Sequence, residues 1–116
     1  MSEIFKSIQA YCLVKEGAFE DHPWGDPVWK VGPKGKIFCF GGLASMTVRA
    51  TLDEQSALIQ LPGIQIAAYV GRYGWIIVDL SQPQNLEFAP ELIDRSYELV
   101  LAKSSRAPAR QSRPKG

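Results

Sequence analysis

The stretch of sequence that decides the fold runs from His22 to Phe40 and reads H-P-W-G-D-P-V-W-K-V-G-P-K-G-K-I-F-C-F. Two prolines and one glycine within His22–Pro27 exclude regular structure there and indicate a turn. Val28–Val31 and Lys36–Phe40 are apolar runs of strand length, and Gly32–Gly35 between them is a tight connection. The stretch therefore predicts a β-hairpin that follows a proline-rich turn.

Successive side chains of a strand point to opposite faces of the sheet, so the hairpin sequence also predicts which residues share a face. In the second strand, Lys36, Phe38 and Phe40 are expected on one face and Cys39 on the other. Trp29 is expected on the apolar face of the first strand. On this pattern, Trp24, Trp29 and Phe38 are candidates for stacking on a ligand or for lining an apolar groove, although aromatic residues at such positions more often pack in a core or a turn.

Before this stretch the sequence predicts one helix. Apolar residues recur at helical spacing from Ile4 to Cys12, and Gly17 is placed to end the helix soon after Val14 or Lys15. Ala18–Asp21 then predicts a short strand.

After the stretch, alternation over Ala44–Ala50 predicts a third strand, so that three strands form an antiparallel meander. Thr51 and Glu54 match a capping box, which predicts a helix over Asp53–Leu61. The following residues are an apolar connector with a brief strand at 67–70.

The last part of the chain predicts a central strand and a final helix. The run Trp75–Leu80 is apolar on both faces at its start, which places Trp75 in the core. Pro90 suits the first turn of the last helix, so the helix is expected to begin there after a loop over residues 81–88.

This order of elements favours an α+β fold, in which an antiparallel sheet is covered on one face by N- and C-terminal helices. A chain of 116 residues is long enough for one hydrophobic core, and residues 1–103 are expected to form a single domain. Residues 104–116 lack periodicity and are rich in Ser, Arg, Pro and Ala, so they predict a disordered basic tail.

Charge is distributed unevenly along the chain, although the net charge is only +1. Residues 103–116 carry five bases and no acid, which leaves residues 1–102 with 8 bases against 12 acids and a net charge of −4. The N-terminus has no signal-peptide pattern and no run is long enough to cross a bilayer, so we expect a cytoplasmic protein with no membrane partner. Separately, we expect a monomer.

Enzyme chemistry has little support in the sequence. His22 lies beside two acids but has no nucleophile or orienting partner at a recognisable spacing, and a turn residue is the better interpretation. Cys12 and Cys39 are read as buried thiols, with a disulfide between them as the alternative. Gly32–Lys36 lacks the Ser/Thr and the following helix of a phosphate loop. We expect no enzyme activity, no cofactor and no metal.

The residues able to contact a phosphate backbone are the bases of the hairpin, of the later strands and of the tail. These candidates are Lys30, Lys34, Lys36, Arg49, Arg72, Arg106, Arg110, Arg113 and Lys115.

Several short motifs, in their order and spacing, resemble the MmcQ/YjbR family over about residues 3–103. The motifs are Pro23-Trp24-Gly25, Val28-Trp29-Lys30-Val31, Lys36-Ile37-Phe38, Pro62-Gly63-Ile64, Ala68-Tyr69, Trp75 and Ser96-Tyr97-Glu98-Leu99-Val100. The resemblance implies a frataxin-like (CyaY-like) fold and a small cytoplasmic bacterial protein that binds DNA through a double-wing arrangement. Lys30 and Lys36 match lysines of the family pattern. Iron binding, as in frataxin, is not implied, because the first helix lacks a dense acidic ridge.

Two functional hypotheses follow. The first is a non-enzymatic protein that binds double-stranded DNA with little sequence specificity through the bases named above. The second is a module for a protein partner or a small ligand, with an apolar groove around Trp24, Trp29 and Phe38.

Overall fold

The computed structural model describes residues 3–68 and 70–106, with side chains described as far as residue 102. In chain order the elements are α1 (Glu3–Leu13), β1 (Phe19–Asp21), β2 (Val28–Val31), β3 (Lys36–Gly41), β4 (Ser45–Arg49), α2 (Leu52–Leu58), β5 (Ile64–Ile66), the 3₁₀ turn η1 (Gly71–Tyr73), β6 (Trp75–Asp79) and α3 (Pro83–Arg106).

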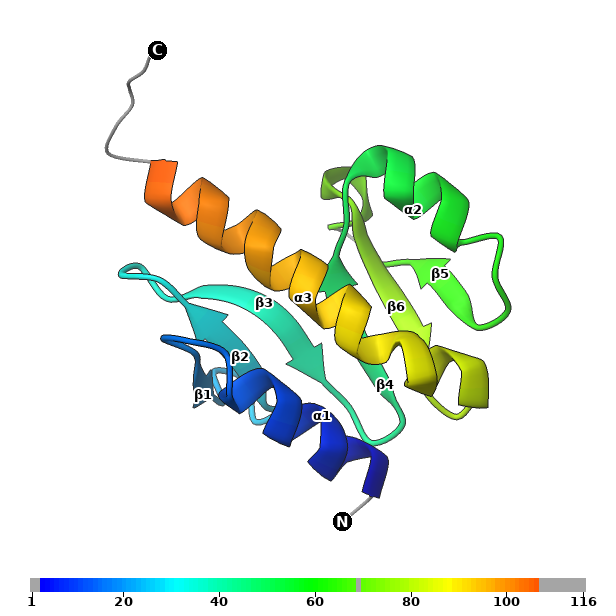
Figure 1. Ribbon diagram of the computed structural model, residues 1–116, viewed down its shortest axis with the longest axis horizontal. Coiled ribbons are helices and arrows are strands. Elements are labelled where there is room, and N and C mark those ends of the chain that lie inside the picture. The colour runs from blue at the N-terminus through cyan, green and yellow to red at the C-terminus, as the bar shows by residue number, and fades with distance from the viewer. Residues whose placement is uncertain (1–2, 69, 107–116) are drawn as a thin grey trace.

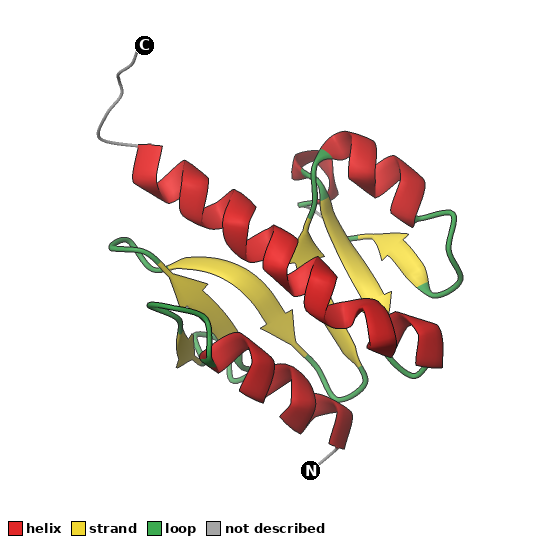
Figure 2. Ribbon diagram, in the orientation of Figure 1, coloured by secondary structure: helices red, strands yellow, loops and turns green. Residues whose placement is uncertain are grey.

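The six strands form one sheet in the order β1-β2-β3-β4-β6-β5, and every neighbouring pair is antiparallel. Helices α1 and α3 lie across one face of this sheet (Figure 1). The helices and strands thus form two layers (Figure 2). The α+β prediction, with terminal helices on one face of an antiparallel sheet, is confirmed.

The hydrophobic core fills the space between the helix layer and the sheet. Its largest fully buried side chains include Trp29, Phe38, Met46, Ile76 and Ile93. Burial of each such side chain stabilises the fold by about 1.5–3 kcal/mol.

Trp29 also has a polar partner, because an indole N–H left unpaired in a core would be costly. Its Nε1–H donates to Oε1 of Glu20 at 3.0 Å, and Gln9 Nε2 donates to the same oxygen at 2.9 Å. The Glu20 carboxylate therefore links α1, β1 and β2.

A β-bulge in β3 changes the predicted arrangement of its side chains. Trp29 pairs with Cys39 and Lys30 with Ile37, so Phe38 is an extra residue without a direct partner on β2. Phe38 and Cys39 are consequently both buried, and Phe38 meets the ring of Tyr97 on α3 edge-on at 5.3 Å. The prediction that Phe38 and Phe40 share a face, opposite Cys39, is wrong, because the extra residue interrupts strict alternation.

Several boundaries also differ from the predictions, among them the end of α2, which is Leu58 rather than Leu61. Helix α3 begins at Pro83, passes through Pro90 and continues to Arg106, three residues beyond the predicted end of the domain. Proline has no backbone N–H, so Pro90 costs the helix one hydrogen bond. Burial of Ala89, Leu92 and Ile93 around it stabilises the continuous helix by more than this loss. The strand after α2 is Ile64–Ile66 rather than 67–70.

Helix α2 begins as its sequence predicts. The side chain of Thr51 accepts from the backbone N–H of Glu54, and the Glu54 carboxylate accepts from the backbone N–H of Thr51, which completes the capping box. Gln55, buried in this helix, donates to the carbonyl oxygens of Gly71 and Trp75 at 2.7 and 3.0 Å. These bonds fix the turn η1 beside the start of β6.

Candidate functional site

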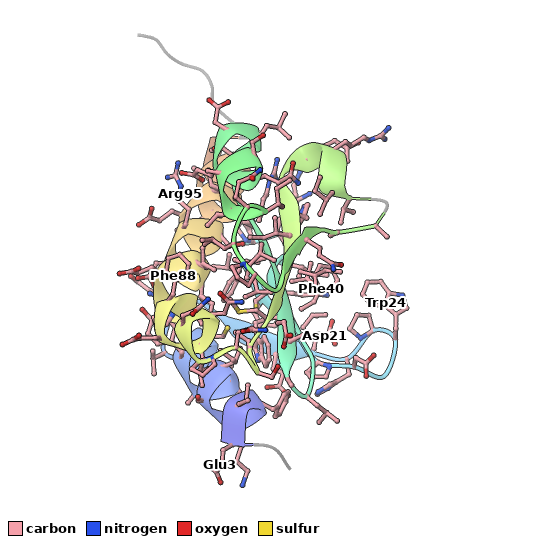
Figure 3. The ribbon with its side chains drawn as sticks, turned by 90° about the vertical axis from the view of Figure 1, so that its right-hand side faces the viewer. Glu3, Asp21, Trp24, Phe40, Phe88 and Arg95 are labelled. Carbon is pink, nitrogen blue, oxygen red and sulfur yellow. The ribbon has the colours of Figure 1, made fainter. Side chains whose placement is uncertain are left out.

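No described helix covers the second face of the sheet, and three aromatic side chains form a row on it. Trp24, from the turn before β2, stacks on Phe40 with ring centroids 6.4 Å apart and planes 19° apart. Phe40 in turn meets Trp75 of β6 edge-on at 5.6 Å. Figure 3 shows Trp24 and Phe40 on one side of the molecule, with Phe88 and Arg95 of α3 on the other. We call Trp24, Phe40 and Trp75 the aromatic row.

The aromatic row differs from the aromatic set predicted from the sequence. Trp24 is 71% exposed, as a stacking residue requires, but Trp29 and Phe38 are fully buried in the core. A groove or stacking surface that uses Trp29 or Phe38 is therefore ruled out, and that part of the prediction is wrong. Trp75, expected in the core, is half-buried on the open face instead.

A buried serine of α3 holds the sheet together where β3 and β4 separate. Ser96 is fully buried, and its hydroxyl donates to the carbonyl oxygen of Phe38 at 2.6 Å. The same hydroxyl accepts from the backbone N–H of Arg49 at 2.8 Å. Beyond the pair Cys39–Val48 the two strands make no further ladder pair, so the Ser96 hydroxyl replaces the missing backbone bond at the bulge.

The separation of these strands produces a groove of about 460 Å³ beside the aromatic row. Its lining residues are Gly35, Lys36, Ile37, Phe40, Arg49, Val70, Trp75 and Val100. Val100 lies one helical turn after Ser96 on α3 and is almost fully buried, so the helix closes the groove from behind. We call this hollow the sheet groove. It combines an apolar wall with two cationic side chains.

Four of the five candidate bases of residues 1–102 lie at the end of the sheet where this groove is found. Lys34 lies in the β2–β3 turn and Lys36 begins β3, while Arg49 ends β4 and Arg72 lies in η1. Antiparallel pairing places the start of β3 and the end of β4 at the same end of the sheet. No ion pair joins any of the four to a carboxylate of the described residues. We call Lys34, Lys36, Arg49 and Arg72 the basic end.

The fifth candidate, Lys30, is in a different electrostatic situation. Its Nζ lies 2.6 Å from Oδ2 of Asp21 on the neighbouring strand. The hydrogen bond from Lys30, together with that from the backbone N–H of His22, lowers the pKa of Asp21. The charge of Lys30 is therefore largely compensated within the fold.

Arg49 and Arg72 are held by their neighbours. Arg49 Nε donates to the carbonyl oxygen of Tyr73 at 3.2 Å, which uses one of the five donors of its guanidinium group. Arg72 donates to the Tyr73 hydroxyl at 2.9 Å and lies over the ring, 5.0 Å from its centroid. Both also line a second hollow, of about 400 Å³, together with residues at the start of α2 and near the end of α3.

Acidic residues are concentrated in the helix layer. Seven of the twelve lie in the helices: Glu3, Asp53, Glu54, Glu87, Glu91, Asp94 and Glu98. The basic end is thus positively charged, while the helix layer carries most of the negative charge. The net charge of the domain does not reveal this separation.

The predicted tail residues lie at or beyond the limit of the described structure. Arg106 is the last residue of α3, and its side chain is not described. Arg110, Arg113 and Lys115 lie outside the described residues.

Other groups considered from the sequence have structural partners. His22 Nε2 lies 3.0 Å from Oε2 of Glu20, whose carboxylate already binds Gln9 and Trp29. Cys12 and Cys39 are free, buried thiols, and burial raises the pKa of Cys39. Within residues 3–68 and 70–106, no group of three or more potential metal ligands is found, and no helix has the length and apolarity needed to cross a membrane.

Phe40, Trp75 and Ser96 are the functional candidates that sequence reasoning missed. The alternation rule assigned Phe40 to the same face as Phe38, and the apolar run assigned Trp75 to the core. The β-bulge places Phe38 and Phe40 on opposite faces of the sheet, and no residue in the sequence of β3 indicates a bulge there. Ser96 offered two signals: it is a polar residue among the apolar positions of the last helix, and it belongs to one of the motifs that resemble the MmcQ/YjbR family.

Comparison with known proteins agrees with this architecture. A crystal structure of a Deinococcus radiodurans protein with a DUF419 domain is similar, with a TM-score of 0.76 at 19% identity over 93% of this chain and 91% of that one. A crystal structure of a Pseudomonas syringae protein has a TM-score of 0.70 at 20% identity over 86% of this chain and 99% of that one. No curated protein matches. The YjbR family model matches residues 13–99, and the chain therefore belongs to the YjbR family.

Proposed function

We propose that this protein is a non-enzymatic DNA-binding protein of low sequence specificity, and that the basic end is its main contact with the phosphate backbone. The observation that carries the proposal is the position of Lys34, Lys36, Arg49 and Arg72 at one end of the sheet without carboxylate partners among the described residues. Lysines and arginines grouped in this way attract phosphates regardless of base sequence.

The net charge of −4 in residues 1–102 is the main argument against such binding. Segregation of charge answers it, because a polyanion responds to the local field of the surface it approaches. With about 8 Å of screening length at physiological ionic strength, only carboxylates close to the basic end act strongly on a phosphate there, and Glu54, which lines a hollow together with Arg49, is itself paired with Arg95. The tail adds Arg110, Arg113 and Lys115 to the same chain.

Fluorescence anisotropy with a labelled DNA duplex tests the proposal. The full chain is titrated at low and at physiological salt, beside Lys36→Gln and a matched control, Lys6→Gln. Lys6 is exposed on α1, in the helix layer, so both variants lose one positive charge but at different places. We expect Lys36→Gln to weaken binding and to reduce the log–log salt slope by about 0.9, the value for one phosphate contact, and Lys6→Gln to have little effect.

Two results would count against the proposal. Absence of binding by the full chain at low salt would refute it outright. Equal loss in Lys36→Gln and Lys6→Gln would show that net charge, not the basic end, governs the interaction.

The sheet groove supports a second candidate function, binding of a small anionic ligand. Its volume of about 460 Å³ lies within the range of small-molecule pockets, about 300–1,000 Å³. Lys36 and Arg49 would hold the anion, and Trp75 would contact an apolar or aromatic part. Thermal unfolding with and without thymidine monophosphate tests this candidate, because a ligand that binds only the folded state raises Tm.

A further inference from the structure

We propose that the open face of the sheet binds single-stranded nucleic acid, with unpaired bases on the aromatic row and the backbone phosphates at the sheet groove and basic end. This inference rests on the proposed nucleic-acid-binding function and specifies its ligand. It differs from duplex binding in a physical respect: only an unpaired base exposes its flat face to a protein ring.

The aromatic row has the geometry that such contacts require. Trp24 is 71% exposed and stacks on Phe40 through one face, which leaves the other face of its indole ring turned away from Phe40. Phe40 of β3 meets Trp75 of β6 edge-on and so continues the row, and Figure 3 shows Phe40 on the side of the molecule away from α3. Phe40 and Trp75 are held on strands, and Trp24 is held by its stacking on Phe40, so these rings lose little conformational freedom when a base stacks on them.

Cationic groups lie directly beside these rings. Phe40 and Trp75 line the sheet groove together with Lys36 and Arg49, so a ring contact and a phosphate contact are available within one hollow. The base and phosphate of a single nucleotide are separated by one sugar, and a strand therefore presents both groups at this spacing repeatedly. Positive groove charge complements the phosphates, whereas it disfavours occupation by the chain's own tail, whose residues 107–116 carry bases and no acid.

An acidic protein segment is the alternative ligand, because its negative charge would also suit the positively charged sheet groove. Such a segment lacks a regular series of flat rings, and it would leave the exposed ring of Trp24 without a matching group. A duplex is excluded from the rings because its bases are stacked on one another. The combination of rings and cations therefore favours a single strand.

The test uses the full chain and three fluorescent probes of equal length, about 12 nucleotides, which is within the site sizes of single-strand-binding domains. The first is an oligothymidylate. The second is an abasic oligomer with the same phosphates and no bases, and the third is a duplex. The protein variants are Trp24→Ala, Trp24→Phe and a control, Val14→Ala, which alters a 76% exposed apolar residue just after α1.

We expect the oligothymidylate to bind about tenfold more tightly than the abasic oligomer, because base stacking on an aromatic ring contributes roughly that factor. Trp24→Ala should remove most of this difference and leave binding of the abasic oligomer unchanged. Trp24→Phe should retain part of it, and Val14→Ala all of it. Circular dichroism of each variant verifies that the fold is retained.

The possible failures are distinguishable. Equal binding of the oligothymidylate and the abasic oligomer, with no effect of Trp24→Ala, would overturn this inference while the proposed function stands. Tighter binding of the duplex than of the oligothymidylate would overturn it as well. Failure of the full chain to bind any probe at low salt would overturn both.

Discussion

At the scale of single residues, Ser96 has the largest structural influence on the candidate site. Its hydroxyl binds both strands where their ladder ends, with the Phe38 carbonyl as acceptor and the Arg49 N–H as donor. The sheet groove opens directly beside this contact. A buried side chain of α3 therefore sets the spacing between β3 and β4, and the candidate site lies on the opposite, open face of these two strands.

We expect Ser96→Ala to destabilise the protein by about 1–3 kcal/mol, because two buried backbone groups lose their partner. Urea unfolding measures the loss. Amide hydrogen exchange locates it: the Arg49 N–H should exchange faster, while the Thr47 N–H, opposite Phe40 in the β3–β4 ladder, should change less. An unchanged exchange rate at Arg49 would show that the hydroxyl does not hold the strands.

Gly74 is the residue at which backbone freedom matters most. Its φ is +99°, in the left-handed region, and a Cβ there would lie 1.9 Å from the carbonyl oxygen of Ala50. We expect Gly74→Ala to cost about 2–4 kcal/mol, because a backbone atom cannot move aside as a flexible side chain would. The measurement is Tm by circular dichroism. Gly25→Ala is the matched control, since Gly25 also has positive φ but nothing within 4 Å of the added Cβ.

At the scale of elements, carboxylates tie the helices to one another. Asp94 of α3 pairs with Lys15 and accepts from the hydroxyl of Tyr11 on α1. Glu54 of α2 pairs with Arg95 of α3 at 2.9 Å. The hydrogen bond from Arg95 lowers the pKa of Glu54; burial opposes this effect, and the backbone N–H of Thr51 adds to it.

This contact predicts a pH dependence with a definite sign. Because the pKa of Glu54 is lower in the folded state, its contribution to stability is present above its unfolded pKa, about 4.3, and is lost as the pH falls through the folded value. We expect Glu54→Gln to reduce stability modestly at pH 7, since the pair is partly exposed, and to make little difference below about pH 3. Urea unfolding at both pH values measures this. A constant difference between variant and parent would contradict the account.

Sequence patterns predicted most of the helices and strands but not their irregularities. Apolar periodicity and cap signals identified the first helix, the hairpin, the capping box at Thr51 and the strand beginning at Trp75. The bulge at Phe38 was not predictable, because it arises from pairing with β2 and packing under Tyr97. The start of α3 was missed because Pro90 was read as a helix start, although burial of Ala89 and Ile93 keeps the helix continuous through it.

At the scale of the whole molecule, the domain has two dissimilar faces. One face carries most of the acids and the helices, while the other carries the aromatic row beside the basic end. Sequence identified the bases but not their grouping, because grouping depends on which strand ends meet. The sequence also misassigned two of the three aromatic candidates, because Trp29 and Phe38 are buried in the core.

The tail and the folded face should contribute differently to binding. In the full chain, replacing Arg110, Arg113 and Lys115 by glutamine should lower affinity for every nucleic acid probe, with a salt slope smaller by about 0.7–0.9 per lost phosphate contact. The ratio of affinities for oligothymidylate and abasic oligomer should stay the same, because stacking involves only the aromatic row. A fall in that ratio would mean that the tail takes part in base contacts.

The proposed binding surface is the open face of the sheet. A titration of the ¹⁵N-labelled full chain with the oligothymidylate, followed by amide and indole N–H chemical shifts, identifies the residues that contact the ligand. We expect shifts for Lys36, Ile37, Phe40, Arg49 and the indole N–H groups of Trp24 and Trp75, with the buried indole of Trp29 little affected. Shifts confined to the outer surface of α1 and α3, or to the tail alone, would contradict it.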